Sequence, residues 1–179
     1  MSVFTNSASR SQDDSGSYVD AVLDLLGDRD PLAVLRATAA EVALRMEGIS
    51  TEALTRPERE GKWSMRHVVR HLADSEIAWS WRLRVVLSQD RPPLPGYDQD
   101  AWAAGLHYDE ADAGQALTEF RMLREANLRL LERASPLDFA RVGIHAERGE
   151  ESVAFMMKLY AGHDLLHLGQ LDRIRAVVG

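Results

Sequence analysis

The chain has 179 residues, of which 45% are hydrophobic and 27% charged, a composition typical of a globular protein built as one domain. Its formal net charge of −7 opposes binding to phosphate backbones and anionic lipid, so neither nucleic acid nor a membrane is expected as a partner. The sequence has no cysteine, which excludes disulfides, thiolate metal ligands and a cysteine nucleophile.

The N-terminal residues are rich in Ser, Asn and Asp and contain no apolar run of signal-peptide length. We therefore expect a flexible head over residues 1–16 and a single helical domain over residues 17–179. No apolar stretch approaches the ~20 residues that are needed to cross a bilayer. A cytoplasmic location is the resulting expectation.

The N-terminal third of the chain predicts two helices and a loop. Residues 18–26 predict a short helix, and Asp30 before Pro31 predicts the start of a second helix that runs to about Glu47. A proline, a glycine and several charges without helical spacing predict a loop over residues 49–62.

The middle of the chain predicts one core helix and a crossover. Ser64 can cap a helix over residues 65–88, which lacks Gly and Pro and has apolar residues at three- and four-residue intervals. Three prolines and a glycine then predict a crossover over residues 90–107, with a short helical turn at residues 97–104.

The C-terminal third predicts two more long helices. Residues 109–134 repeat the helical apolar pattern, and a Ser-Pro pair stops it. Residues 135–151 predict a loop, in which only residues 141–145 could pair as a strand. Ser152 begins the last helix, which runs to the C-terminus. Four long helices joined by loops predict an all-α four-helix bundle.

The last helix holds two histidines, His163 and His167, at the centre of its apolar stripe. At about 100° per residue they lie about 40° apart, so both rings point into the core. A buried imidazole without a partner costs about 1–3 kcal/mol. A divalent metal ion would serve both rings, because i, i+4 spacing brings two neutral imidazole nitrogens together. Two separately hydrogen-bonded core histidines would give the same pattern.

A second histidine pair, His67 and His71, lies on the helix predicted over residues 65–88. His71 is about 100° and His67 about 140° from the centre of that helix's apolar stripe. His71 therefore flanks the core and His67 faces outward. His71 together with the pair on the last helix gives three protein ligands, which leaves one coordination position for water or substrate.

For the other histidines and the carboxylates, the sequence gives weaker evidence of a role at a metal site. His107 and His145 fall in predicted loops and are expected to be exposed, although His145 could reach the cavity. Asp74, ahead of Asp164 and Glu76, is the candidate carboxylate for orienting a ligand ring through its other nitrogen. For any one of the three taken alone, a place on the charged surface is the expected role.

Tyr160 and Gln170 share the face of the ligand pair on the last helix, where they could support a ligand ring or contact bound substrate. Core packing is the alternative for Tyr160. The arginine pairs, including Arg82 and Arg84, are interspersed with acids, a pattern typical of solvated helix faces.

Two motifs then resemble a known family. Residues 63–76, WSMRHVVRHLADSE, resemble the second-helix signature of the DinB/YfiT-like family, and residues 163–171, HDLLHLGQL, resemble its last-helix motif. Residues 91–102, which include PGYDQDAW, are similar to the intervening segment of the YfiT branch. The resemblance covers roughly residues 30–175.

The resemblance implies a four-helix bundle with a three-histidine site for one divalent ion, zinc or nickel before others. The matching positions are His71, His163 and His167, the three that the helical wheel selects. Leu166 stands where some relatives have a further histidine, which leaves the ligand set intact and the substrate pocket open. A homodimer is also implied, and Trp81 lies on the helix face opposite Trp79, where a partner could cover it.

The family includes thiol-dependent enzymes that join bacillithiol, mycothiol or glutathione to electrophiles or isomerise maleylpyruvate, and its YfiT branch has the label of metal-dependent hydrolase. We expect a metal-dependent transferase that joins a low-molecular-weight, bacillithiol-like thiol to an electrophile. A hydrolase of a small amide or ester is the alternative, and a non-enzymatic metal-binding stress protein is the third. No glutamate adjoins the ligands as in HExxH, which favours thiol transfer. No catalytic residue is assigned.

Overall fold

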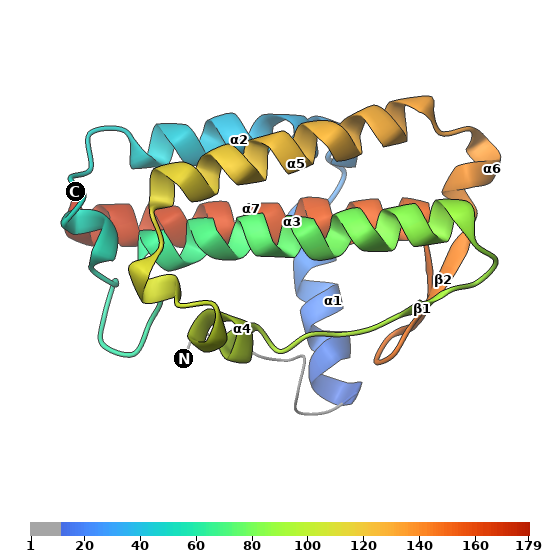
Figure 1. Ribbon diagram of the computed structural model, residues 1–179, viewed down its shortest axis with the longest axis horizontal. Coiled ribbons are helices and arrows are strands. Elements are labelled where there is room, and N and C mark those ends of the chain that lie inside the picture. The colour runs from blue at the N-terminus through green and yellow to red at the C-terminus, as the bar shows by residue number, and fades with distance from the viewer. Residues whose placement is uncertain (1–11) are drawn as a thin grey trace.

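The computed structural model describes residues 12–179, and within them four long helices form the predicted bundle. These are α2 (Pro31–Met46), α3 (Met65–Ser88), α5 (Ala113–Arg133) and α7 (Val153–Val178). α2 and α5 lie along one side of the bundle and α3 and α7 along the other (Figure 1). The fold class predicted from the sequence is confirmed.

The first helix, α1 (Gln12–Leu26), runs across the bundle rather than along it (Figure 1). It begins at Gln12, earlier than the predicted residue 18, so residues 12–16 of the expected flexible head are helical. The remainder of the expected head, residues 1–11, lies outside the described residues. α1 packs on α7 at Gly162, where a Cβ atom would lie 2.1 Å from the carbonyl oxygen of Val22. Gly162 thus allows the close approach of α1 to the helix turn that holds His163.

Side-chain caps explain where three of the long helices begin. Asp30 accepts a hydrogen bond from the backbone N–H of Leu32 at the start of α2, and Ser152 accepts one from Phe155 at the start of α7. Asp112 caps α5 in the same way. That helix therefore starts at Ala113 and not at the predicted residue 109, since a short 3₁₀ helix, η2 (Tyr108–Glu110), precedes the cap.

Residues 135–151, predicted as a loop in which only residues 141–145 could pair, fold into a short helix and a hairpin, and one strand of that hairpin lies within residues 141–145. α6 (Pro136–Phe139) is followed by β2 (Val142–His145) and β3 (Gly149–Ser152), which pair antiparallel. β1 (Pro93–Leu94), from the crossover, pairs parallel with β2. The sheet joins two segments about fifty residues apart in the sequence and lies beside one end of the bundle (Figure 1). Strands of two to four residues are too short to give a readable alternation.

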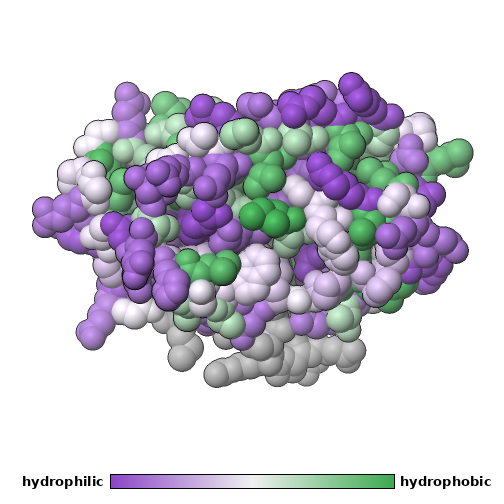
Figure 2. Space-filling view, viewed as in Figure 1, coloured by the Kyte–Doolittle hydropathy of each residue, from purple (hydrophilic) through white to green (hydrophobic). Residues whose placement is uncertain are grey.

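Two shorter elements complete the described chain: η1 (Ala53–Thr55) within the predicted loop before α3, and α4 (Gln99–Gly105) in the crossover. α4 confirms the predicted helical turn over residues 97–104. The core lies between the long helices, and on the face in Figure 2 hydrophilic side chains predominate, with hydrophobic ones scattered among them. Within residues 12–179, no helix is both long enough and apolar enough to span a membrane.

Candidate metal centre

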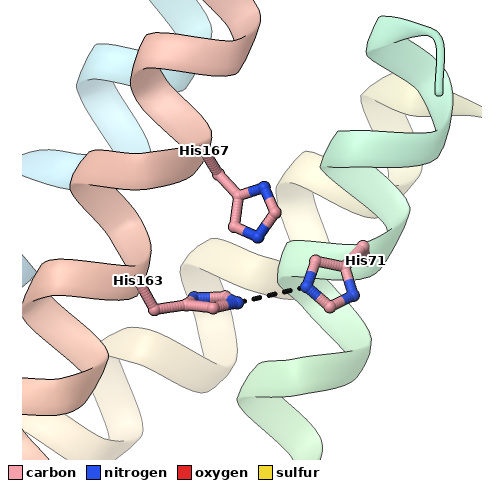
Figure 3. A group of neighbouring side chains, drawn as sticks. All are labelled: His71, His163 and His167. Carbon is pink, nitrogen blue, oxygen red and sulfur yellow. Dashed lines mark hydrogen bonds between the residues drawn. The ribbon is translucent and has the colours of Figure 1, made fainter. Parts of the chain in front are cut away.

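Three histidine rings converge inside the bundle. His71 extends from α3, while His163 and His167 extend from successive turns of α7 (Figure 3). Their candidate ligand nitrogens all lie within 4.8 Å of one another, and the residues are only 1%, 8% and 4% exposed. The structure therefore brings together the three histidines that the sequence predicts as ligands.

The spacing of the rings fits a divalent ion. The Nε2 atoms of His71 and His163 are 3.1 Å apart. Two imidazole nitrogens that bind one tetrahedral ion at about 2.0–2.1 Å are separated by roughly 3.3 Å. The convergence of three buried nitrogen donors, without any charged group between them, matches the donor set that zinc and nickel accept.

The environment keeps two of the rings neutral, which is the form that binds metal. Burial, with the neighbouring rings of His167 and His163, holds the pKa of His71 well below its usual value. Burial, with His163 next to it, lowers the pKa of His167 to about 3. Both rings thus offer a free nitrogen lone pair at neutral pH without first losing a proton.

Gln170 orients one of the ligand rings. Its Oε1 atom lies 2.9 Å from Nδ1 of His167, and both residues are buried. In the tautomer that satisfies this contact, Nδ1–H donates to the amide oxygen and Nε2 remains free for a metal ion. Of the two roles that the sequence allows for Gln170, support of a ligand ring and contact with substrate, the structure places it in the first.

A buried charge network lies behind His163. Arg124, on α5, donates hydrogen bonds to Oε2 of Glu76 at 2.8 Å and to Oδ1 of Asp164 at 3.1 Å. Thr38 donates to Oδ2 of Asp164, and Asn127 donates to Oε1 of Glu76, both at 2.7 Å. The network thus connects α2, α3, α5 and α7 immediately beside the centre.

The charged groups in this network shift one another's pKa values. Burial alone would raise the pKa of Asp164, but the guanidinium of Arg124 lowers it to about 2. Burial alone would lower the pKa of Arg124, and the two carboxylates raise it instead. Burial raises the pKa of Glu76 in spite of its contact with Arg124. Glu76 and Asp164 are therefore core residues, and the prediction that they are charged surface is wrong.

Sequence reasoning missed Arg124, although a signal was present. Arg124 and Asn127 share one face of α5 with Phe120 and Leu131, at spacings of four, three and four residues. Two polar residues within an apolar stripe predict a buried polar network, just as the histidines of α7 predict a buried site.

Asp164 is the carboxylate nearest to a ligand ring, and Asp74 is not. Oδ1 of Asp164 lies 3.8 Å from Nδ1 of His163, which is too long for a hydrogen bond, and this Nδ1 has no partner among the described side chains. Asp74 instead accepts from Arg70 on its own helix. Asp164 therefore lies beside His163 without a hydrogen bond to its ring.

His67 and His107 lie away from the centre. The ring of His67 contacts Ser64 at 2.8 Å and a carboxylate oxygen of Asp109 at 3.0 Å. His107 is exposed, as predicted, in the turn before η2.

A cavity of about 80 Å³ begins at His163. Tyr160 lines it and also stacks on Trp79 at a ring distance of 4.4 Å, so it packs in the core and faces the cavity as well. His145 lies in β2 and is buried, so its predicted exposure is wrong. Arg82 is buried as well and is not on a solvated face. Both residues line the cavity, together with Tyr18, Tyr97 and Arg148.

Comparison with known proteins places the histidine centre in a family. The sequence model of the DinB superfamily matches residues 35–171, which include all three histidines. The chain belongs to the DinB superfamily. One relative, from Oceanobacillus iheyensis, is 30% identical over 126 residues, covers 70% of this chain and 73% of its own, and is named a "Putative metal-dependent hydrolase".

Two further matches are to YfiT of Bacillus subtilis. Its sequence, named "Putative metal-dependent hydrolase YfiT", is 27% identical over 146 residues, which are 79% of this chain and 82% of that protein. Its solved structure matches 96% of this chain and 91% of its own with a TM-score of 0.74 at 23% identity. That structure is described as having an unusual four-helix bundle topology, so this DinB-superfamily chain shares the YfiT-like fold.

Proposed function

We propose that this DinB-superfamily protein is a metal-dependent transferase that joins a low-molecular-weight thiol, of the bacillithiol kind, to an electrophile. The observation that supports it most is the three-histidine centre beside a cavity, in a chain without cysteine. A divalent ion, zinc or nickel, would lower the pKa of a coordinated thiol and so supply the thiolate. The nucleophile would come from the small molecule.

The described residues have the parts that this reaction needs. His71, His163 and His167 would hold the ion, and Gln170 would fix the ring of His167. Three protein ligands leave a position for the sulfur atom. The cavity that begins at His163 would give the sulfur atom of the thiol access to the ion. A non-enzymatic, structural metal site would instead be expected to use a fourth protein ligand.

A hydrolase of a small amide or ester is the second candidate, because the relatives bear that name and because one carboxylate lines the cavity without an ion pair. Hydrolysis requires a general base that activates water. Asp164 is held by Arg124, and Glu151 is held by Arg148. Glu147 forms no ion pair with any described residue, so it is the base that this alternative would use.

Metal-loaded protein is expected to accelerate transfer of a small thiol to a haloarene or to monochlorobimane, and metal-free protein is not. A free thiol with a pKa near about 8.5 is only a few per cent thiolate at pH 7. Coordination to a divalent cation removes that limit, so the catalysed rate should be nearly constant between about pH 6 and 8, whereas the uncatalysed rate follows the thiolate fraction. Mass spectrometry of the conjugate measures both rates.

Elemental analysis of protein purified without chelator or nickel resin should accompany this assay, because it identifies the metal. The His163→Ala variant, treated identically, serves as the inactive control. Cleavage of esters or amides by the metal-loaded form, with no thiol turned over, would reject the transferase and establish the hydrolase.

We also propose that the protein is a homodimer. Ile77 and Trp81 lie one turn apart on α3, and each is 47% exposed, which is unusual for two large apolar side chains on one helix face. Light scattering at micromolar concentration should give twice the chain mass of 20.0 kDa. An Ile77→Lys, Trp81→Lys variant should be monomeric with its helix content unchanged. A wild-type monomer would contradict the proposal.

A further inference from the structure

We propose that Arg82 and His145 form a subsite, in the cavity beside the histidine centre, that binds a carboxylate group of the substrate. The inference deepens the proposed function and rests on it, since the same molecule would place its sulfur at the metal and its carboxylate here. Neither residue is a candidate metal ligand. Arg82 extends from α3 and His145 from β2. Each has a polar N–H group whose position no structural role in the described fold explains.

His145 presents a buried hydrogen-bond donor that has no acceptor. Its Nδ1 atom accepts the backbone N–H of Glu147 at 3.2 Å, which assigns the proton of the neutral ring to Nε2. Burial, with the charges of Arg148 and Arg82, lowers the pKa of His145 to about 3, so the ring is neutral. The residue is 2% exposed, and its Nε2 has no partner among the described residues. A buried donor of this kind costs free energy unless a ligand satisfies it.

Arg82 presents a buried positive charge without a carboxylate. It is 6% exposed, and none of the carboxylates in the described part of the chain lies within 4.0 Å of its guanidinium. One of its nitrogens donates to the carbonyl oxygen of Pro95 at 2.6 Å, which fixes the side chain and leaves other N–H groups available. Its guanidinium carbon lies 5.8 Å from the ring centre of Tyr97. Buried arginines are normally paired with an anion.

The fold places these two groups together. Leu94 of β1 pairs with His145 of β2, and Arg82 bonds to Pro95, the residue that follows Leu94. The pairing of β1 with β2, of which the sequence indicates only the strand within residues 141–145, therefore brings His145 to the arginine on α3. Both residues line the same cavity as His163, so one small molecule can contact the centre and the subsite at once.

The charge of the lining favours a carboxylate over a phosphate. Arg148 also lines the cavity, but Glu151 neutralises it, and Glu147 adds a further negative charge to the lining. The lining therefore has no excess of positive charge, which disfavours a doubly charged phosphate more strongly than a singly charged carboxylate. A planar carboxylate can also accept from the flat guanidinium and the ring N–H together.

The test uses the full chain loaded with cobalt, whose absorption changes when a thiolate binds. Mercaptoacetate, mercaptopropionate, mercaptobutyrate and mercaptohexanoate are each compared with the mercaptoalcohol of the same length. At one length or more, the carboxylate form should bind at least about tenfold more tightly than the alcohol, as expected for hydrogen bonds to a charged group. Equal affinities across the whole series would overturn the subsite.

Variants assign the preference to the two residues. Arg82→Gln and His145→Phe, on different elements, should each reduce the preference for the carboxylate severalfold and leave the affinity for the alcohol unchanged. Arg175→Gln is the matched control, because Arg175 also donates to backbone carbonyls, those of Leu44 and Arg45, and does not line the cavity. A preference that survives in both cavity variants would overturn the assignment.

A second measurement separates failure of the subsite from failure of the proposed function. In nitrogen-labelled protein, butyrate should shift the Nε2 resonance of His145, and butanol should not. If no thiol alters the cobalt absorption but butyrate shifts this resonance, the subsite stands and thiol transfer is rejected. If butyrate leaves the resonance unchanged, the subsite is wrong whatever the thiols do.

Discussion

Replacing His163 or His167 with Ala should abolish tight metal binding, and His71→Ala should have the same effect, whereas His67→Ala should leave binding nearly intact. The three buried rings are the ones whose nitrogens lie within 4.8 Å of one another, and His67 turns instead to Ser64 and Asp109. Loss of a residue that merely supports a ligand weakens metal affinity by about 10- to 100-fold. Loss of a ligand itself should exceed that range.

Competition with a chromophoric chelator, combined with elemental analysis, measures this effect at equilibrium. His67→Ala is the matched control, since it removes the same side chain from the same helix one turn away from His71. The metal affinity of Gln170→Ala should lie between that of the ligand variants and that of His67→Ala, because the substitution frees the ring of His167 without removing it. Equal metal loss in His67→Ala and His71→Ala would reject the ligand assignment.

The parts of this structure that the sequence predicts are those set by local periodicity. Long helices repeat their apolar residues over about four to seven turns, so their faces can be derived from a helical wheel. His163 and His167 occupy the centre of such a face, and His71 the edge of another, which made the ligand set derivable from helix geometry alone. The caps Asp30 and Ser152 fixed two helix starts for the same local reason.

The parts that could not be predicted depend on contacts between distant segments. The sequence predicts His145 in an exposed loop, but in the structure β1 pairs with β2 and His145 is buried. The sequence predicts Arg82 on the surface. Its hydrogen-bond partner is a backbone carbonyl in the crossover, and such a partner leaves no signal in the sequence. The sequence does not distinguish Asp164 from Asp74 as the carboxylate beside a ligand ring, because the charge that fixes Asp164 comes from Arg124 on another helix.

The Arg124→Met variant should lose about 3–5 kcal/mol in the free energy of unfolding, the typical cost of removing one partner of a buried ion pair. Methionine fills a similar volume, so the loss arises chiefly from electrostatics. Glu76 and Asp164, each about 1% exposed, would both lose their counter-charge in the core. Contacts of the guanidinium with the rings of Trp79 and Phe120 would also be lost.

Urea unfolding of metal-free protein measures this loss without a contribution from bound metal. Arg36→Met is the control, because Arg36 forms an ion pair with Glu132 that is half-exposed and should be worth no more than about 1 kcal/mol. Adding Glu76→Gln and Asp164→Asn to Arg124→Met should restore much of the stability, since no unpaired charge then remains in the core. If Arg124→Met costs no more than the surface control, the network does not stabilise the fold. If the triple variant is less stable than Arg124→Met alone, hydrogen bonding by the two carboxylates, rather than their buried charge, accounts for the effect.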